Sequence, residues 1–99
     1  MAGAAPSADK LRSALEKIKA AIRESLGPKD QLKFLGMIDG IQQAINNGQI
    51  TQEALQGPIF RAKASTRKTL REDPLAMSQL LNGFENLEEE IMRILAELD

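Results

Sequence analysis

The stretch PLAMSQLLNGFENLEEEIMRILAEL, residues 74–98, decides the fold class. Its apolar residues alternate three and four positions apart without interruption, which places them on one face of an α-helix. Such a heptad pattern is typical of a helix that packs against other helices, and Leu81 and Leu95 widen the apolar stripe. We call this stripe the seam; it consists of Met77, Leu80, Phe84, Leu87, Ile91, Ile94 and Leu98. We expect one long amphipathic helix from Pro74 to the C-terminus, with Asp73 as its N-cap.

Prolines divide the rest of the chain into further helical segments. Proline fits the first turn of a helix, where its missing N–H is not needed, and it disfavours helix in the residue before it. We predict helices from about Ser7 to Leu26, from Pro28 to Asn46 and from Pro58 to Arg71, with a separate short helical turn from Ile50 to Gln56. Valine, tyrosine and tryptophan, which favour strands, are absent from the 99 residues. The sequence therefore predicts an all-α protein: a small bundle of about four helices in a single domain, residues 7–99, after a flexible tail, residues 1–6.

The composition excludes most catalytic and metal-binding chemistry. The chain has no cysteine and no histidine, so neither a nucleophilic triad with histidine nor an ordinary zinc site can form. The acidic residues Glu85, Glu88, Glu89 and Glu90 offer carboxylates, but the last three are consecutive and fan around the helix. We expect no enzymatic activity, no cofactor, no metal and no small-molecule substrate.

The chain also lacks the features of membrane insertion or secretion. No apolar run approaches the roughly 18 residues that a transmembrane helix needs. Residues 1–7 contain neither a charged region nor an apolar block, and so do not resemble a signal peptide. We therefore expect no membrane contact and a cytoplasmic location.

Charge is divided along the chain. Residues 1–71 contain twelve Lys and Arg against six Asp and Glu, a net charge of +6, while residues 72–99 carry a net charge of −7. The densest basic segment could bind nucleic acid phosphates through Arg61, Lys63, Arg67, Lys68 and Arg71. It has no aromatic residue for base stacking beyond Phe60, so we favour pairing of these cations with Glu88–Glu90, within one chain or across a dimer.

A second stripe of small residues marks the helix predicted at Pro28–Asn46. It consists of Gly36, Gly40 and Ala44, at a spacing of four. Two interior glycines weaken a helix, so we predict that this face packs closely against a neighbouring helix.

These features favour binding over catalysis. The seam can be buried within one chain, as the wide stripe indicates, or shared between chains, as the length of its helix suggests; we favour a homo-oligomer. We therefore expect a non-catalytic helical protein–protein interaction module, an adaptor, assembly factor, chaperone-like partner or regulatory subunit. Its partner surface would combine the seam with the face that bears Gly36 and Gly40. The alternative is a small nucleic-acid-binding regulator that uses the basic segment, residues 61–71.

Overall fold

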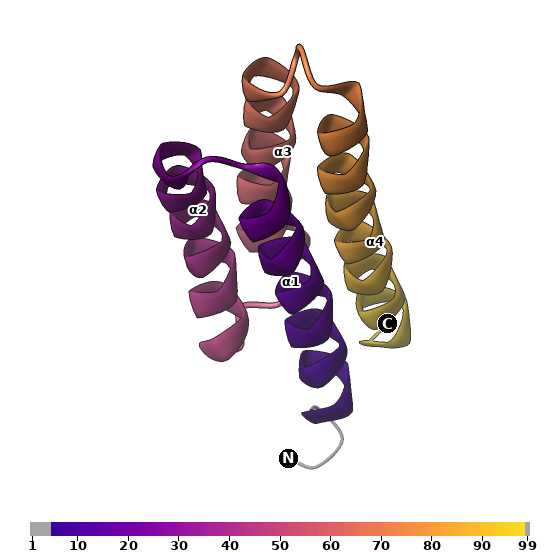
Figure 1. The fold of residues 1–99 in the computed structure, drawn as a ribbon. Helices are drawn as coiled ribbons and strands as arrows, with labels where there is room; N and C mark the ends of the chain where they lie inside the picture. The colour runs from indigo at the N-terminus through magenta and orange to yellow at the C-terminus, as the bar shows by residue number, and fades with distance from the viewer. Residues whose placement is uncertain (1–4, 99) are drawn as a thin grey trace.

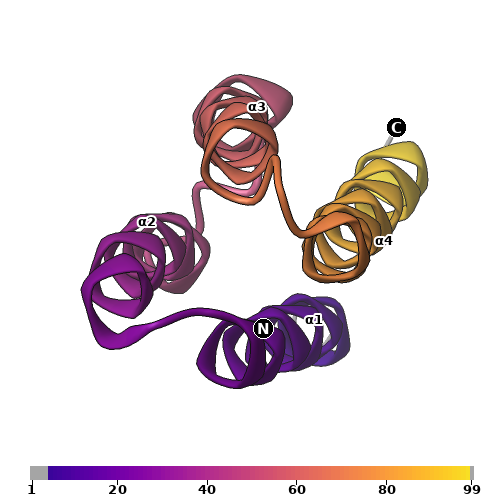
Figure 2. The same cartoon turned by 45° about the horizontal axis from the view of Figure 1, so that its top comes forward.

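The structure, a computed structural model, describes the backbone of residues 5–98 and the side chains of residues 9–97. Within that range the chain forms an up-and-down bundle of four antiparallel helices (Figure 1). They are α1 (Ala5–Ser25), α2 (Pro28–Asn46), α3 (Gln52–Thr69) and α4 (Pro74–Leu98). Each helix contacts the next one, and α1 also contacts α4, so the four surround one core (Figure 2). The prediction of a small all-α bundle is confirmed.

The core is built from the apolar stripes of all four helices. Nineteen hydrophobic side chains are buried among the described residues. The α1 stripe and the α2 stripe are nearly inaccessible: Leu11, Leu15, Ile18 and Ile22 in the first, and Phe34, Ile38, Ile41 and Ile45 in the second. Spacings of three and four bring such residues to one side of a helix, and burial of that side stabilises the bundle.

Local hydrogen bonds fix where the helices begin and end. Gly48 has a φ of +77°, and its N–H and that of Gln49 donate to carbonyls in the last turn of α2, an arrangement typical of a glycine-terminated helix. The Thr51 hydroxyl accepts from the N–H of Ala54, at 3.0 Å, and caps α3. An Asp73 carboxylate oxygen accepts from the N–H of Ala76 at 3.2 Å, as predicted for the start of α4.

Two predicted boundaries are wrong. Helix α1 begins at Ala5, so Pro6 and Ser7 lie inside it, Ser7 is not its N-cap, and only residues 1–4 of the predicted tail fall outside the described backbone. The turn predicted at Ile50–Gln56 and the helix predicted from Pro58 are one continuous helix, α3, with Pro58 inside it. The continuous helix keeps Leu55 and Ile59, four residues apart, together in the core. Their burial offsets the poor fit of an interior proline.

Pro58 should therefore weaken α3 measurably. It has no N–H to donate to the carbonyl of Ala54, and its ring crowds that carbonyl. Pro58→Ala should raise the free energy of unfolding by about 1–2 kcal/mol, less than the roughly 3 kcal/mol typical of an interior proline, because the half-buried ring also loses contacts. Urea unfolding followed by circular dichroism measures this change. Pro28→Ala, at the first turn of α2, is the control and should have little effect; a loss of stability in Pro58→Ala would show that ring packing dominates.

Candidate interaction surface

The seam lies inside the bundle. Leu80, Phe84 and Leu87 are fully buried, Ile91 and Ile94 are buried to more than nine-tenths, and Met77 is half-buried against the core. The side chain of Leu98 lies outside the described residues. This burial corrects the prediction that the seam is a partner surface. The seam is buried within the chain, because α1 and α3 flank α4 and cover it.

The two glycines of the small-residue face of α2 do not pack against another helix among the described residues. Gly36 and Gly40 are exposed, and no atom beyond the adjacent residues and the local helix backbone lies within 4 Å of a Cβ built on either of them. Ala44 is half-buried at the edge of the core. The prediction of close packing at Gly36 and Gly40 is therefore wrong within this bundle. The exposed side chain of Leu32 lies one turn before Gly36 on the same face.

The close helix approach occurs instead at Gly83 in α4. A Cβ built on Gly83 would lie 2.9 Å from Cγ1 of Ile18, which is buried in α1. Sequence reasoning missed this residue because Gly83 has no small residue four positions away. The sequence feature that could have identified it is a glycine inside an otherwise strong helical pattern, because such a glycine often allows two helices to pack closely.

The basic residues of α3 fall into two groups. Nζ of Lys63 lies 2.9 Å from Oε1 of Glu88, and both side chains are largely buried between α3 and α4. This ion pair confirms the predicted pairing with the acidic part of α4 for one residue. The other predicted cations are exposed, and no carboxylate of the described residues lies within 4 Å of them: Arg61, Arg67, Lys68 and Arg71.

The exposed face of α3 also carries an aromatic ring. Phe60 is 67% exposed, and it shares one side of the helix with Ala64 and Arg67, at spacings of four and three. Arg71 is also exposed, in the turn that follows the end of α3 at Thr69. The sequence identified Phe60 as the aromatic residue of the basic segment without indicating which way its side chain points. An exposed phenylalanine among unpaired arginines is not needed for the fold.

Helix α4 presents an acidic counterpart at the same spacing. Glu85, Glu89, Met92 and Ala96 share one side of α4 and are exposed, and Met92 is 54% exposed. A groove of about 230 Å³ runs between α3 and α4, and Met92 forms one wall beside Gln52 and Gln56. We call this side of the bundle the α3–α4 surface; it consists of Phe60, Arg67, Arg71, Glu85, Glu89 and Met92.

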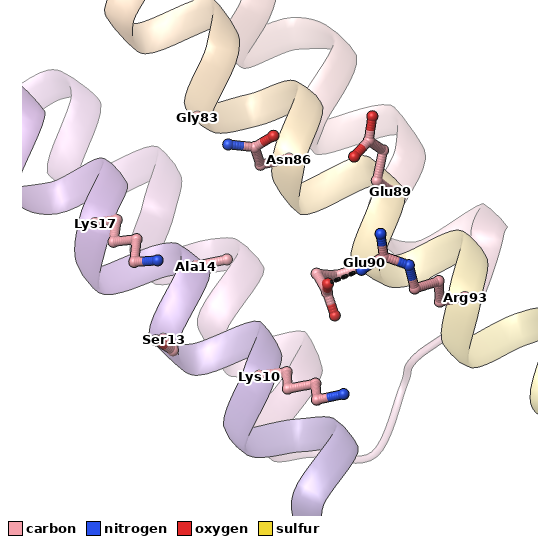
Figure 3. Close-up of a pocket in the computed structure, with 9 residues that line it drawn as sticks. All are labelled: Lys10, Ser13, Ala14, Lys17, Gly83, Asn86, Glu89, Glu90 and Arg93. Atoms are coloured by element: carbon pink, nitrogen blue, oxygen red, sulfur yellow. Dashed lines mark hydrogen bonds and ion pairs between the residues drawn. The ribbon is translucent and has the colours of Figure 1, made fainter.

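A second groove, of about 460 Å³, lies between α1 and α4 (Figure 3). Lys10 and Lys17 extend from α1 toward α4, while Glu90 is paired with Arg93 within α4. Ser13, Ala14, Gly83, Asn86 and Glu89 complete the lining. The groove is open and polar, whereas ligand pockets are concave and mostly apolar. It does not have the character of a small-molecule site.

The described residues hold no cluster of three or more Asp or Glu that could bind a metal ion. Every buried side-chain nitrogen and oxygen among them has a hydrogen-bond partner within the protein, so none requires a ligand to satisfy it. In the same part of the chain no helix has the length and apolar character needed to cross a membrane.

No protein family model, no curated protein and no solved structure matches this chain. The assignment of function therefore depends on the geometry of its surfaces.

Proposed function

We propose that this chain is a non-catalytic helical interaction module that binds a protein partner through the α3–α4 surface. The observation that carries the proposal is the exposure of Phe60 and Met92 beside arginines that have no carboxylate partner in the bundle. Aromatic residues, methionine and arginine are the types enriched at protein–protein interfaces. The few residues that contribute most of the binding free energy of an interface are also usually large side chains that lose their water on binding.

This proposal retains the predicted class of function and changes the surface that performs it. Neither the buried seam nor a catalytic site is required. The face of α2 with Gly36 and Gly40 is a weaker candidate, because the cations beside its exposed Leu32 are Lys29 and Lys33, and lysine is depleted at protein–protein interfaces whereas arginine is enriched.

Site-specific photo-crosslinking in cells of the native host tests the proposal. Phe60 is replaced by the photoreactive analogue p-benzoylphenylalanine, and Leu32, which is 77% exposed on α2, is replaced in the same way as the control. We expect a discrete protein adduct from position 60 and none from position 32. Equal adducts at both positions, or none at either, would contradict the proposal. An adduct that nuclease treatment removes would instead assign the basic side of α3 to nucleic acid.

A further inference from the structure

We propose that the α3–α4 surface binds a second copy of this chain, in a two-fold dimer in which α3 of each copy packs against α4 of the other. This inference rests on the proposed function and names its partner. The surface is complementary to itself because one helix supplies arginines and the other supplies glutamates, and each supplies one exposed apolar side chain.

The register of α3 and α4 supports this complementarity. The two helices are antiparallel, and two side-chain contacts relate their levels: Nζ of Lys63 lies 2.9 Å from Oε1 of Glu88, and Nε2 of Gln52 lies 3.9 Å from Sδ of Met92. Midway between these two contacts, Phe60 lies roughly one turn from the level of Met92 and Arg67 roughly one turn from the level of Glu85, a separation that side chains of this length can span. A two-fold axis parallel to the helices preserves the level of every residue while it places α3 opposite α4.

Each half of such a dimer repeats the same two contacts. Phe60 of one copy meets Met92 of the second copy, a pairing of sulfur with an aromatic ring that is favourable when both are buried. Arg67 meets Glu85 of the second copy. A charge-assisted hydrogen bond of this kind sets orientation and partner choice.

The size of the surface is sufficient for a stable dimer. A standard interface buries about 800 Å² on each partner. One long side of a molecule that measures 43 × 20 × 18 Å offers an area of that order. The Lys63–Glu88 ion pair lies near the middle of this side and is already satisfied within the chain, so it adds no unpaired charge to the interface.

Charge exchange between two variants tests the dimer. The purified wild type should have twice the chain mass of 10.8 kDa in sedimentation equilibrium. Arg67→Glu and Glu85→Arg should each weaken the dimer at least roughly tenfold, because each places like charges opposite one another twice. An equimolar mixture of the two variants should form dimers again, since each altered residue then faces its opposite charge. Charges that meet only within one chain cannot produce this recovery.

The control variants are Lys33→Glu and Asp39→Arg on the exposed side of α2, which change the net charge equally and should leave the dimer intact. A wild type that stays monomeric overturns the dimer, yet an adduct of position 60 with another protein would leave the proposed function standing. Wild-type dimers that neither α3–α4 variant weakens, or variants that do not recover on mixing, overturn the contact. A monomer that binds an oligonucleotide, with the binding lost in Arg67→Glu, assigns the surface to nucleic acid and overturns the inference.

Discussion

Phe84→Ala should lower the free energy of unfolding by about 3–5 kcal/mol, the usual cost of removing a buried phenylalanine from a well-packed core. Phe84 is fully buried in the middle of α4, where its ring contributes to the contacts of α4 with the rest of the bundle. The loss combines the transfer of the ring from water with the cavity that remains. For a domain of this size it would remove a large part of the total stability.

Phe60→Ala is a matched control for this prediction, because it makes the same substitution in the middle of a neighbouring helix. Phe60 is 67% exposed, so at concentrations where the chain is monomeric its removal should change the free energy of unfolding by no more than about 0.5 kcal/mol. Urea unfolding of both variants at two protein concentrations gives the comparison. In the proposed dimer the loss in Phe60→Ala grows at the higher concentration, because Phe60 lies in the interface, whereas the loss in Phe84→Ala stays the same. A loss in Phe84→Ala that depends on concentration, or equal losses in the two monomeric variants, would contradict the burial of the seam within one chain.

The fold was predictable because each helix carries a periodic apolar stripe. Leu11, Leu15, Ile18 and Ile22 lie on one side of any helix that contains them, and the structure buries all four. The capping residue was equally informative: Asp73 lies at the start of α4 in the structure and accepts from the N–H of Ala76, as predicted. Local rules succeed where local geometry and core burial demand the same conformation.

The error at α3 shows where local rules fail. Proline disfavours helix in the preceding residue, so Pro58 predicted a helix start. In the structure the helix begins six residues earlier, at Gln52, where Thr51 provides the cap. Burial of Leu55 and Ile59 requires contacts with other helices, and no rule that considers only neighbouring residues includes them.

The interaction surface was the least predictable part. A sequence pattern identifies which residues are apolar but not which helix covers them, so the seam was assigned to a partner although the chain buries it itself. The uneven distribution of charge was a better guide. It predicted contact between the cations of α3 and the acidic part of α4, and Lys63 and Glu88 form that contact. Whether the remaining cations are paired or exposed depends on the direction of their side chains. Periodicity alone did not predict this direction for Arg67, nor for the neighbouring Phe60.

The same reasoning separates the glycines. A glycine within a helix is unfavourable by roughly 1 kcal/mol relative to alanine, so an interior glycine either reflects close packing or is an avoidable weakness. Gly83 belongs to the first class and Gly40 to the second, since a Cβ would meet Ile18 at Gly83 and nothing within 4 Å at Gly40.

Gly83→Leu should therefore destabilise the protein although it improves the helix propensity of α4. Its Cβ would lie 2.9 Å from Cγ1 of Ile18, and Ile18 is 1% exposed and branched at its Cβ, so its side chain cannot easily rotate away. Helices α1 and α4 must separate to admit the new side chain. Overpacking of this kind costs about 1–3 kcal/mol, and we expect the upper half of that range after the propensity gain.

Gly40→Leu makes the same substitution on the exposed side of α2, where the propensity gain meets no clash, and should raise the free energy of unfolding by about 0.5–1 kcal/mol. Thermal unfolding should then shift in opposite directions, by several degrees each, since 1 kcal/mol corresponds to roughly 4–8 °C in a domain of this size. Shifts of the same sign would show that propensity or exposure, rather than the contact with Ile18, decides the outcome. Opposite shifts would establish Gly83 as the residue that lets α1 and α4 approach each other, the contact that closes the bundle.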